Sequence, residues 1–205
     1  MTNLDAKENL PASLGKISST MHVMSDKCIA MTTAPESVTS LVAACGEGNL
    51  NTIKTLLDNG GDVDGHDDVG LTPLLAAARS GSLDVVRLLL DCGADLTKTN
   101  QEGESPLIAA ASGGHVDVVR LLLDNKDEID KTGKGDNTAL ICAARESHAE
   151  LVKFLLGIGA TVDLVDRNGT LVLLAAAAGG HVEVVEALLE EGLISTKPTR
   201  KVSRR

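Results

Sequence analysis

The apolar residues of the chain follow a pattern that repeats every 33 residues. The leucines that open successive blocks show the period: Leu41, Leu74, Leu107, Leu140 and Leu173. Each block holds a leucine- and alanine-rich run, a short polar stretch, and a second run of aliphatic residues such as VVRLLL. In both runs the apolar residues recur at the three- and four-residue spacing of an amphipathic helix. The pattern therefore predicts five units, each made of two short helices.

The second unit contains signals for where each helix begins and ends. Thr72 is suited to cap the first helix, and Pro73 fits its first turn because the missing N–H would have no partner there. Gly81 is expected to end that helix. Asp84 places a negative charge at the start of the second helix, where the helix dipole favours it. In the fifth unit Leu171 stands in place of the capping threonine, so we expect its first helix to begin without this cap.

The block from Asp67 to Leu96, DDVGLTPLLAAARSGSLDVVRLLLDCGADL, resembles the ankyrin repeat, which combines a turn, a Thr-Pro-Leu-His segment, paired alanines and two short helices. Five blocks match in register, at about residues 37–66, 67–99, 100–132, 133–165 and 166–195. The resemblance implies an all-α ankyrin-repeat solenoid of paired antiparallel helices with hairpin-like finger loops. We expect this domain (37–195) to lie between a disordered N-terminal arm (1–36) and a basic C-terminal tail (196–205).

The resemblance also implies a concave surface, built from the fingers and the first helices, that binds a partner protein. Val69 and Leu71 are apolar where a finger should face solvent, which makes them candidate anchors. Arg79 and Arg145 belong to a residue type enriched at interface hot spots. An alternative is that some of these side chains pack finger to finger, most readily Val69. By the match to the family, the expected partner-binding residues are His66, Asp68, Val69, Leu71, Arg79, Gln101, Glu102, Glu104, Ser112, Lys134, Asn137, Arg145, Glu146 and Arg167.

Three features depart from the family pattern. The histidine that usually follows Thr-Pro-Leu is aliphatic in every unit, at Val42, Leu75, Ile108, Ile141 and Leu174. Asp136 stands where other units have a glycine in the finger. Lys126 replaces the glycine expected after the second helix. A residue with a Cβ atom is less stable than glycine in a left-handed conformation by about 1 kcal/mol. We therefore expect Lys126→Gly to stabilise the chain.

Charge and composition narrow the classes of function. The chain has a net charge of −10, and residues 37–195 hold 25 acidic against 11 basic residues, a net charge of −14. Such a body lacks the basic surface that nucleic-acid binding needs, and no apolar run approaches the roughly 18 residues of a membrane span. The four cysteines (Cys28, Cys45, Cys92 and Cys142) show neither metal-ligand nor disulfide spacing, which favours the reducing cytoplasm or nucleus. The chain is expected to be monomeric by itself.

No set of residues indicates catalysis, a metal or a cofactor. His115, His148 and His181 recur every 33 residues, but a metal site needs ligands that converge, so a loop histidine typical of the family is favoured over a metal array. The acidic stretch from Asp124 lacks the alternating oxygen ligands of a calcium loop. In the tail, Ser203 follows three residues that resemble a basic-directed kinase site, and the cluster also resembles a nuclear-import signal. The alternative for the tail is a solvated basic end.

We therefore predict a non-catalytic protein–protein interaction module or adaptor. It acts through the fingers and first helices, in the cytoplasm, the nucleus or both. The alternative is a regulatory or targeting subunit, or an isoform or fragment of a larger complex, built around a kinase, phosphatase, ubiquitin ligase or scaffold.

Overall fold

The computed structural model describes residues 35–125, 127–133 and 135–194 of the chain. Lys126, Lys134, the arm before residue 35, and residues 195–205 with Ser203 lie outside the described residues. The expectations for them therefore stay predictions. Among the described helices, none is long and apolar enough to cross a membrane.

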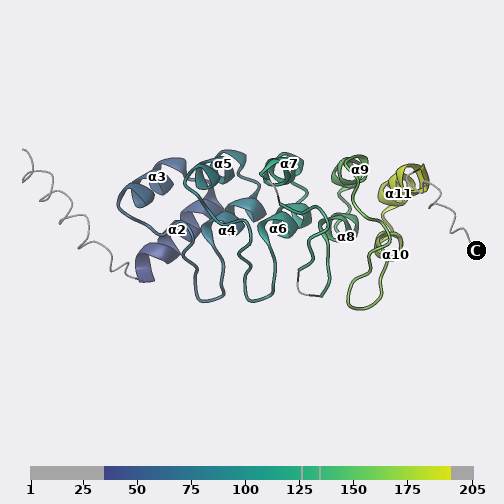
Figure 1. The fold of residues 1–205 in the computed structure, drawn as a ribbon, viewed down its shortest axis with the longest axis horizontal. Helices are drawn as coiled ribbons and strands as arrows, with labels where there is room; N and C mark the ends of the chain where they lie inside the picture. The colour runs from purple at the N-terminus through teal and green to yellow at the C-terminus, as the bar shows by residue number, and fades with distance from the viewer. Residues whose placement is uncertain (1–34, 126, 134, 195–205) are drawn as a thin grey trace, which may run out of the picture.

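Five consecutive helix pairs make up the described part of the chain, and they stack side by side into an elongated body (Figure 1). The outer helices form one row and the inner helices a second row, and the chain enters and leaves at opposite ends. Each inner helix precedes its outer partner, and the pairs are α2 (Pro35–Glu47) with α3 (Leu50–Asp58), α4 (Pro73–Ser80) with α5 (Leu83–Asp91), α6 (Pro106–Ser112) with α7 (Val116–Asp124), α8 (Ala139–Arg145) with α9 (Ala149–Gly157), and α10 (Val172–Ala178) with α11 (Val182–Ile194).

Long loops, which we call the fingers, connect each outer helix to the next inner helix and project from the inner row (Figure 1). Each finger takes the number of the unit whose inner helix follows it, so the second finger lies between α3 and α4. The all-α solenoid expected from the repeat is confirmed, with helix α2 beginning at Pro35. The described chain has one isolated β-bridge, between Val165 and Leu171 at the base of the last finger.

Side chains at the start of the inner helices confirm the predicted caps. Thr72 Oγ1 accepts a hydrogen bond from the Leu75 amide at 3.2 Å, and Thr138 Oγ1 accepts one from the Ile141 amide at 3.3 Å. Both threonines are extended and buried. Leu171 has the same extended backbone but makes no cap bond, as the sequence predicted for the fifth unit.

The core is aliphatic and runs the length of the stack between the two rows of helices. The first four units each contribute the leucine of their inner helix, and every unit contributes a leucine or isoleucine of its outer helix. Alanines let neighbouring inner helices pack closely. Cys45 and Cys142 belong to this layer and are buried. The leucine that opens the fifth block, Leu173, is 41% exposed and lies outside this core.

The recurring histidines tie each unit to the one before it. The Nε2 atom of His148 lies 2.9 Å from the Ser112 carbonyl oxygen, and that of His181 lies 2.8 Å from the Arg145 carbonyl. His115 makes the same contact, at 3.1 Å, with Arg79. Because a carbonyl oxygen only accepts, each ring must carry its proton on Nε2. These loop histidines are inter-unit hydrogen-bond donors, a role that the sequence did not reveal.

Candidate binding face

Each well-formed finger folds around one acidic or amide side chain that begins its turn. In the second unit Asp67 Oδ1 accepts hydrogen bonds from the amides of Val69 and Leu71, at 3.0 and 2.8 Å. Gly70 completes the turn with a φ of 78°, which favours glycine. In the third and fifth units, Asn100 Oδ1 and Asp166 Oδ1 accept the same pair of hydrogen bonds, from the amides two and four residues later. Hydrogen bonds within each of these fingers therefore fix its turn, and no ligand is needed for the finger to fold.

The fourth finger is built differently. Gly133 stands where the other fingers have the capping side chain, so no equivalent bonds form there. Asp136 adopts a φ of 58°, the left-handed conformation that glycine has in the other units. A Cβ atom at Gly133 would lie 2.7 Å from Ile108 Cδ1 and 2.8 Å from the Gly103 carbonyl oxygen. Close packing against the third finger therefore requires glycine at this position.

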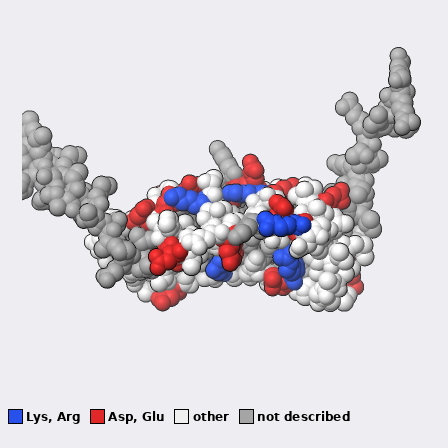
Figure 2. Space-filling model, turned by 90° about the horizontal axis from the view of Figure 1, so that it is seen from below, with Lys and Arg blue, Asp and Glu red and all other residues white. Residues whose placement is uncertain are grey.

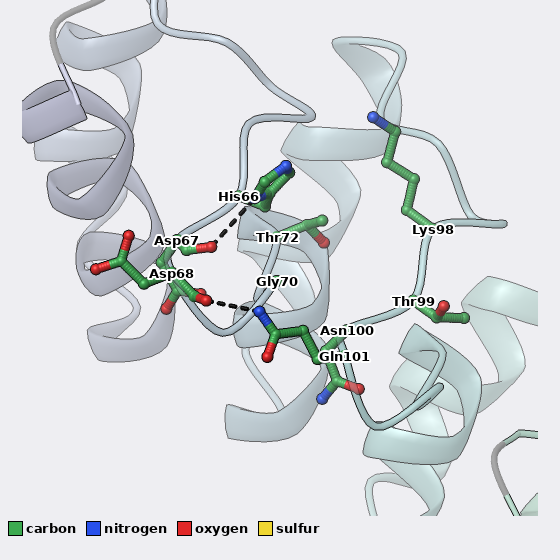
Figure 3. Close-up of a pocket in the computed structure, with 9 residues that line it drawn as sticks. All are labelled: His66, Asp67, Asp68, Gly70, Thr72, Lys98, Thr99, Asn100 and Gln101. Carbon is green, nitrogen blue, oxygen red and sulfur yellow. Dashed lines mark hydrogen bonds between the residues drawn. The ribbon is translucent and has the colours of Figure 1, made fainter.

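Neighbouring fingers are joined to one another. The Gln101 amide donates to the Val69 carbonyl at 3.2 Å, and its side-chain nitrogen donates to the Asp68 carbonyl at 2.7 Å (Figure 3). The Arg167 amide repeats the first of these bonds with the Gly135 carbonyl, at 2.8 Å. Between the second and third fingers lies an open polar groove of about 460 Å³, lined by His66, Asp67, Asp68, Gly70, Thr72, Lys98, Thr99, Asn100 and Gln101. The fingers thus form a continuous surface and not separate loops.

The two arginines expected as hot spots bind the finger of the following unit. Arg79, at the end of α4, forms an ion pair with Glu104. Arg145, at the end of α8, donates to Asn137 at 3.0 Å and to Asp166 at 3.3 Å. The arginine side chains are still 51% and 43% exposed. They are therefore available to a partner, but each also holds an inner helix against a finger.

Asp166 is the most heavily bonded of these acidic residues. Backbone hydrogen bonds from Thr170 and Asn168 stabilise its charged form, and the Arg145 guanidinium adds to the effect, so the pKa of the Asp166 carboxyl lies below its usual value. The residue is buried and begins the turn of the fifth finger. Its carboxylate is therefore a structural group of the finger.

An apolar groove opens on the inner helices at the start of the stack. It has a volume of about 420 Å³ between α2 and α4, next to the second finger. Small residues of the two helices (Ala43, Gly46 and Ala76) line it, and Ala43 and Gly46 are exposed. Leu71 and Arg79 lie at its edge. A groove with an apolar floor and a charged edge suits an apolar side chain of a polypeptide with a polar group beside it.

The structure places most of the expected binding residues on this surface, but not all equally. Val69 is 59% exposed, so most of its side chain is open to solvent and not packed between fingers, whereas Leu71 is half-buried against the core. The other exposed ones are His66, Asp68, Gln101, Glu102, Glu146 and Arg167, and the half-buried ones are Glu104, Ser112 and Asn137. Seen from the finger side, acidic and basic side chains are interspersed over these loops (Figure 2).

Sequence reasoning missed the floor of the groove. Ala43, Gly46 and Ala76 were not among the expected binding residues. A signal was present, because Gly46 occupies the same position of its unit as Arg79, Ser112 and Arg145, all of which were expected to face a partner. Extending that register to the first unit identifies a site where the surface is open.

One family model matches the chain, and it describes ankyrin repeats in three copies. It covers residues 18–100 and 92–166, which is more than half of the sequence, and ends before the fifth helix pair. The search of curated proteins returned no match to the chain.

Proposed function

Because the chain belongs to the ankyrin-repeat family, whose repeats generally serve as protein–protein interaction modules, we propose that it is a non-catalytic adaptor that binds a partner protein along its fingers and inner helices. The observation that carries the proposal is the groove between α2 and α4. The exposed residues Ala43 and Gly46 of α2 line it beside a finger whose shape is already fixed by internal bonds. Such a preformed surface loses little conformational entropy when it binds.

The groove favours a partner segment that places an aliphatic or aromatic side chain over Ala43 and Gly46. The edge of the groove supplies the aliphatic surface of Leu71 and the exposed guanidinium of Arg79 for polar contacts. Asp67 also lines the groove, but its carboxylate is already bonded to the finger. The proposed location is the cytoplasm or nucleus, which the free thiols of Cys45, Cys92 and Cys142 support.

Two glycines offer a matched test of where the partner binds. A Cβ atom added at Gly46, on the groove floor, or at Gly157, on the outer helix α9, meets nothing within 4 Å. Both glycines are also exposed, so a tryptophan side chain at either position starts in open space. After a partner has been isolated by affinity purification and mass spectrometry, Gly46→Trp should weaken its binding by about 10-fold or more, as loss of a hot-spot contact does. Gly157→Trp should leave the affinity unchanged. Equal affinities for both variants would place binding outside the groove.

A further inference from the structure

The last helix pair exposes apolar side chains at positions that the rest of the stack buries. Leu173 and Leu174 are 41% and 58% exposed, whereas their counterparts Leu140 and Ile141 in the fourth unit are 1% and 0% exposed. Ala177 is exposed too, although the residues at this position are buried in the four earlier units. In those units the following helix pair covers these positions. We define the back face of the fifth unit as Leu173, Leu174, Ala177 and Leu189.

The opposite end of the stack has the reverse pattern. Ser40 and Thr52 are exposed in the first unit, but the same positions are buried in every later unit and hold apolar residues there, such as Pro73 and Val85 in the second. These positions therefore face the preceding unit, and we call them front positions. The first unit carries hydroxyl side chains where later units carry apolar ones. The front of the stack is thus adapted to water in its sequence, and the back face is not.

We propose that the back face of the fifth unit binds the front of an ankyrin-type helix pair carried by a partner protein. The junctions inside the chain show which chemistry fits such a face. Where α8 packs against α10, the buried residues include Ile141 from the back of the fourth unit, and Val172 and Ala175 from the front of the fifth. The back face repeats the aliphatic character of Leu140 and Ile141. It therefore matches a front of proline, alanine and valine.

Two other occupants fit the back face less well. A second copy of the chain stacked end to end would bring the hydroxyls of Ser40 and Thr52 against the leucines, leaving polar groups without hydrogen-bond partners. The residues that follow the fifth unit, TKPTRKVSRR, carry five positive charges and one large aliphatic side chain, Val202. A segment of this composition gains little from burial against leucine.

A binding experiment with a probe made from the chain itself tests the proposal. The probe is an array of three copies of residues 100–132, enough repeats for a stable stack. In the last copy of the array, Ile108→Asp places a charge on the back of the array, which prevents one array from stacking on another. In sedimentation or fluorescence titrations the array should form a 1:1 complex with the full chain. Leu174→Asp in the full chain should weaken this complex by about 10-fold or more. An array that does not bind, or that binds both chains equally, would overturn the proposal.

A second measurement does not depend on the array folding alone. Residues 94–126 are inserted between Gly192 and Leu193, which adds one period and keeps the whole chain, since Gly192 has the register of Gly93. The amides of residues 172–178 should then exchange with solvent at least about 10-fold more slowly. Val118→Asp in the inserted copy, at a front position, should abolish this protection. Equal exchange with and without the insert would contradict the proposal.

Two outcomes would assign the back face to another occupant and overturn the proposal as well. The first is a concentration-dependent dimer of the unmodified chain that Leu174→Asp disrupts, which would identify a second copy. The second is faster exchange of residues 172–178 after removal of residues 196–205, which would identify the tail. The groove between α2 and α4 lies at the other end of the stack, so none of these results bears on the proposal for that site.

Discussion

The same substitution at equivalent positions of two units should have very different effects on stability. Ile141 and Leu174 lie 33 residues apart at one position of the repeat. Ile141 is fully buried between units, while Leu174 is 58% exposed. Ile141→Ala and Leu174→Ala remove similar aliphatic groups from the same kind of helix. The difference between them therefore measures whether another surface covers the position.

The expected magnitudes follow from burial. Truncating a buried isoleucine to alanine loses its transfer free energy and leaves a cavity, so Ile141→Ala should lower the free energy of unfolding by about 3 kcal/mol. Full burial of a leucine side chain contributes about 2 kcal/mol. Less than half of Leu174 is buried and its removal opens no cavity, so Leu174→Ala should cost about 1 kcal/mol or less.

Urea titrations followed by circular dichroism, at several protein concentrations, are a suitable assay. Ile108→Ala is the control, because Ile108 is buried at the same position of an interior unit and should behave as Ile141 does. A loss for Leu174→Ala as large as that for Ile141→Ala would refute the reasoning. It would show that the back face is already covered in the isolated chain.

Three further predictions concern single side chains. Because the pKa of Asp166 is lowered in the folded chain, its carboxylate adds stability above about pH 4, and this contribution is lost as the pH falls through the lowered pKa. The fifth finger should therefore loosen in acid, as measured by amide exchange between pH 7 and 3. Asp166→Asn should remove this pH dependence. Ser147 has a φ of 67°, so Ser147→Gly should raise the free energy of unfolding by about 1 kcal/mol, and an unchanged urea midpoint would contradict this. Iodoacetamide should modify exposed Cys92 well before Cys45, because burial raises the pKa of the Cys45 thiol to about 12; similar rates by mass spectrometry would contradict the packing.

The elements of the fold were predictable from local signals in the sequence. The 33-residue period, the caps at Thr72 and Thr138 and the uncapped start at Leu171 all depend on residues close in the chain. Each signal also recurs in several units, so one weak indication is supported by the others. The prediction for Lys126 is different, because that residue lies outside the described residues and stays untested. Ser147, with its positive φ, was not noticed in the sequence.

The details of the binding face depend on how neighbouring units sit against each other. Arg79 pairs with Glu104, 25 residues away, and Arg145 with Asp166, 21 residues away. The different separations show that no fixed spacing in the sequence announces such a pair. The groove over Gly46 likewise exists only because α2 and α4 lie side by side. The sequence indicates which residues belong to the surface, and the stacking decides which are free to bind.

The central claim, that a partner protein binds the fingers and inner helices, is tested most directly by alanine substitutions measured against that partner by calorimetry. Val69→Ala and Leu71→Ala remove apolar atoms on the second finger, whereas Arg87→Ala changes an exposed residue of the outer helix α5. The account predicts that one or both finger substitutions weaken binding by about 1 kcal/mol or more, and that Arg87→Ala has no effect. Unchanged affinity for both finger variants, with lost affinity for Arg87→Ala, would place the partner on the outer helices and contradict the account.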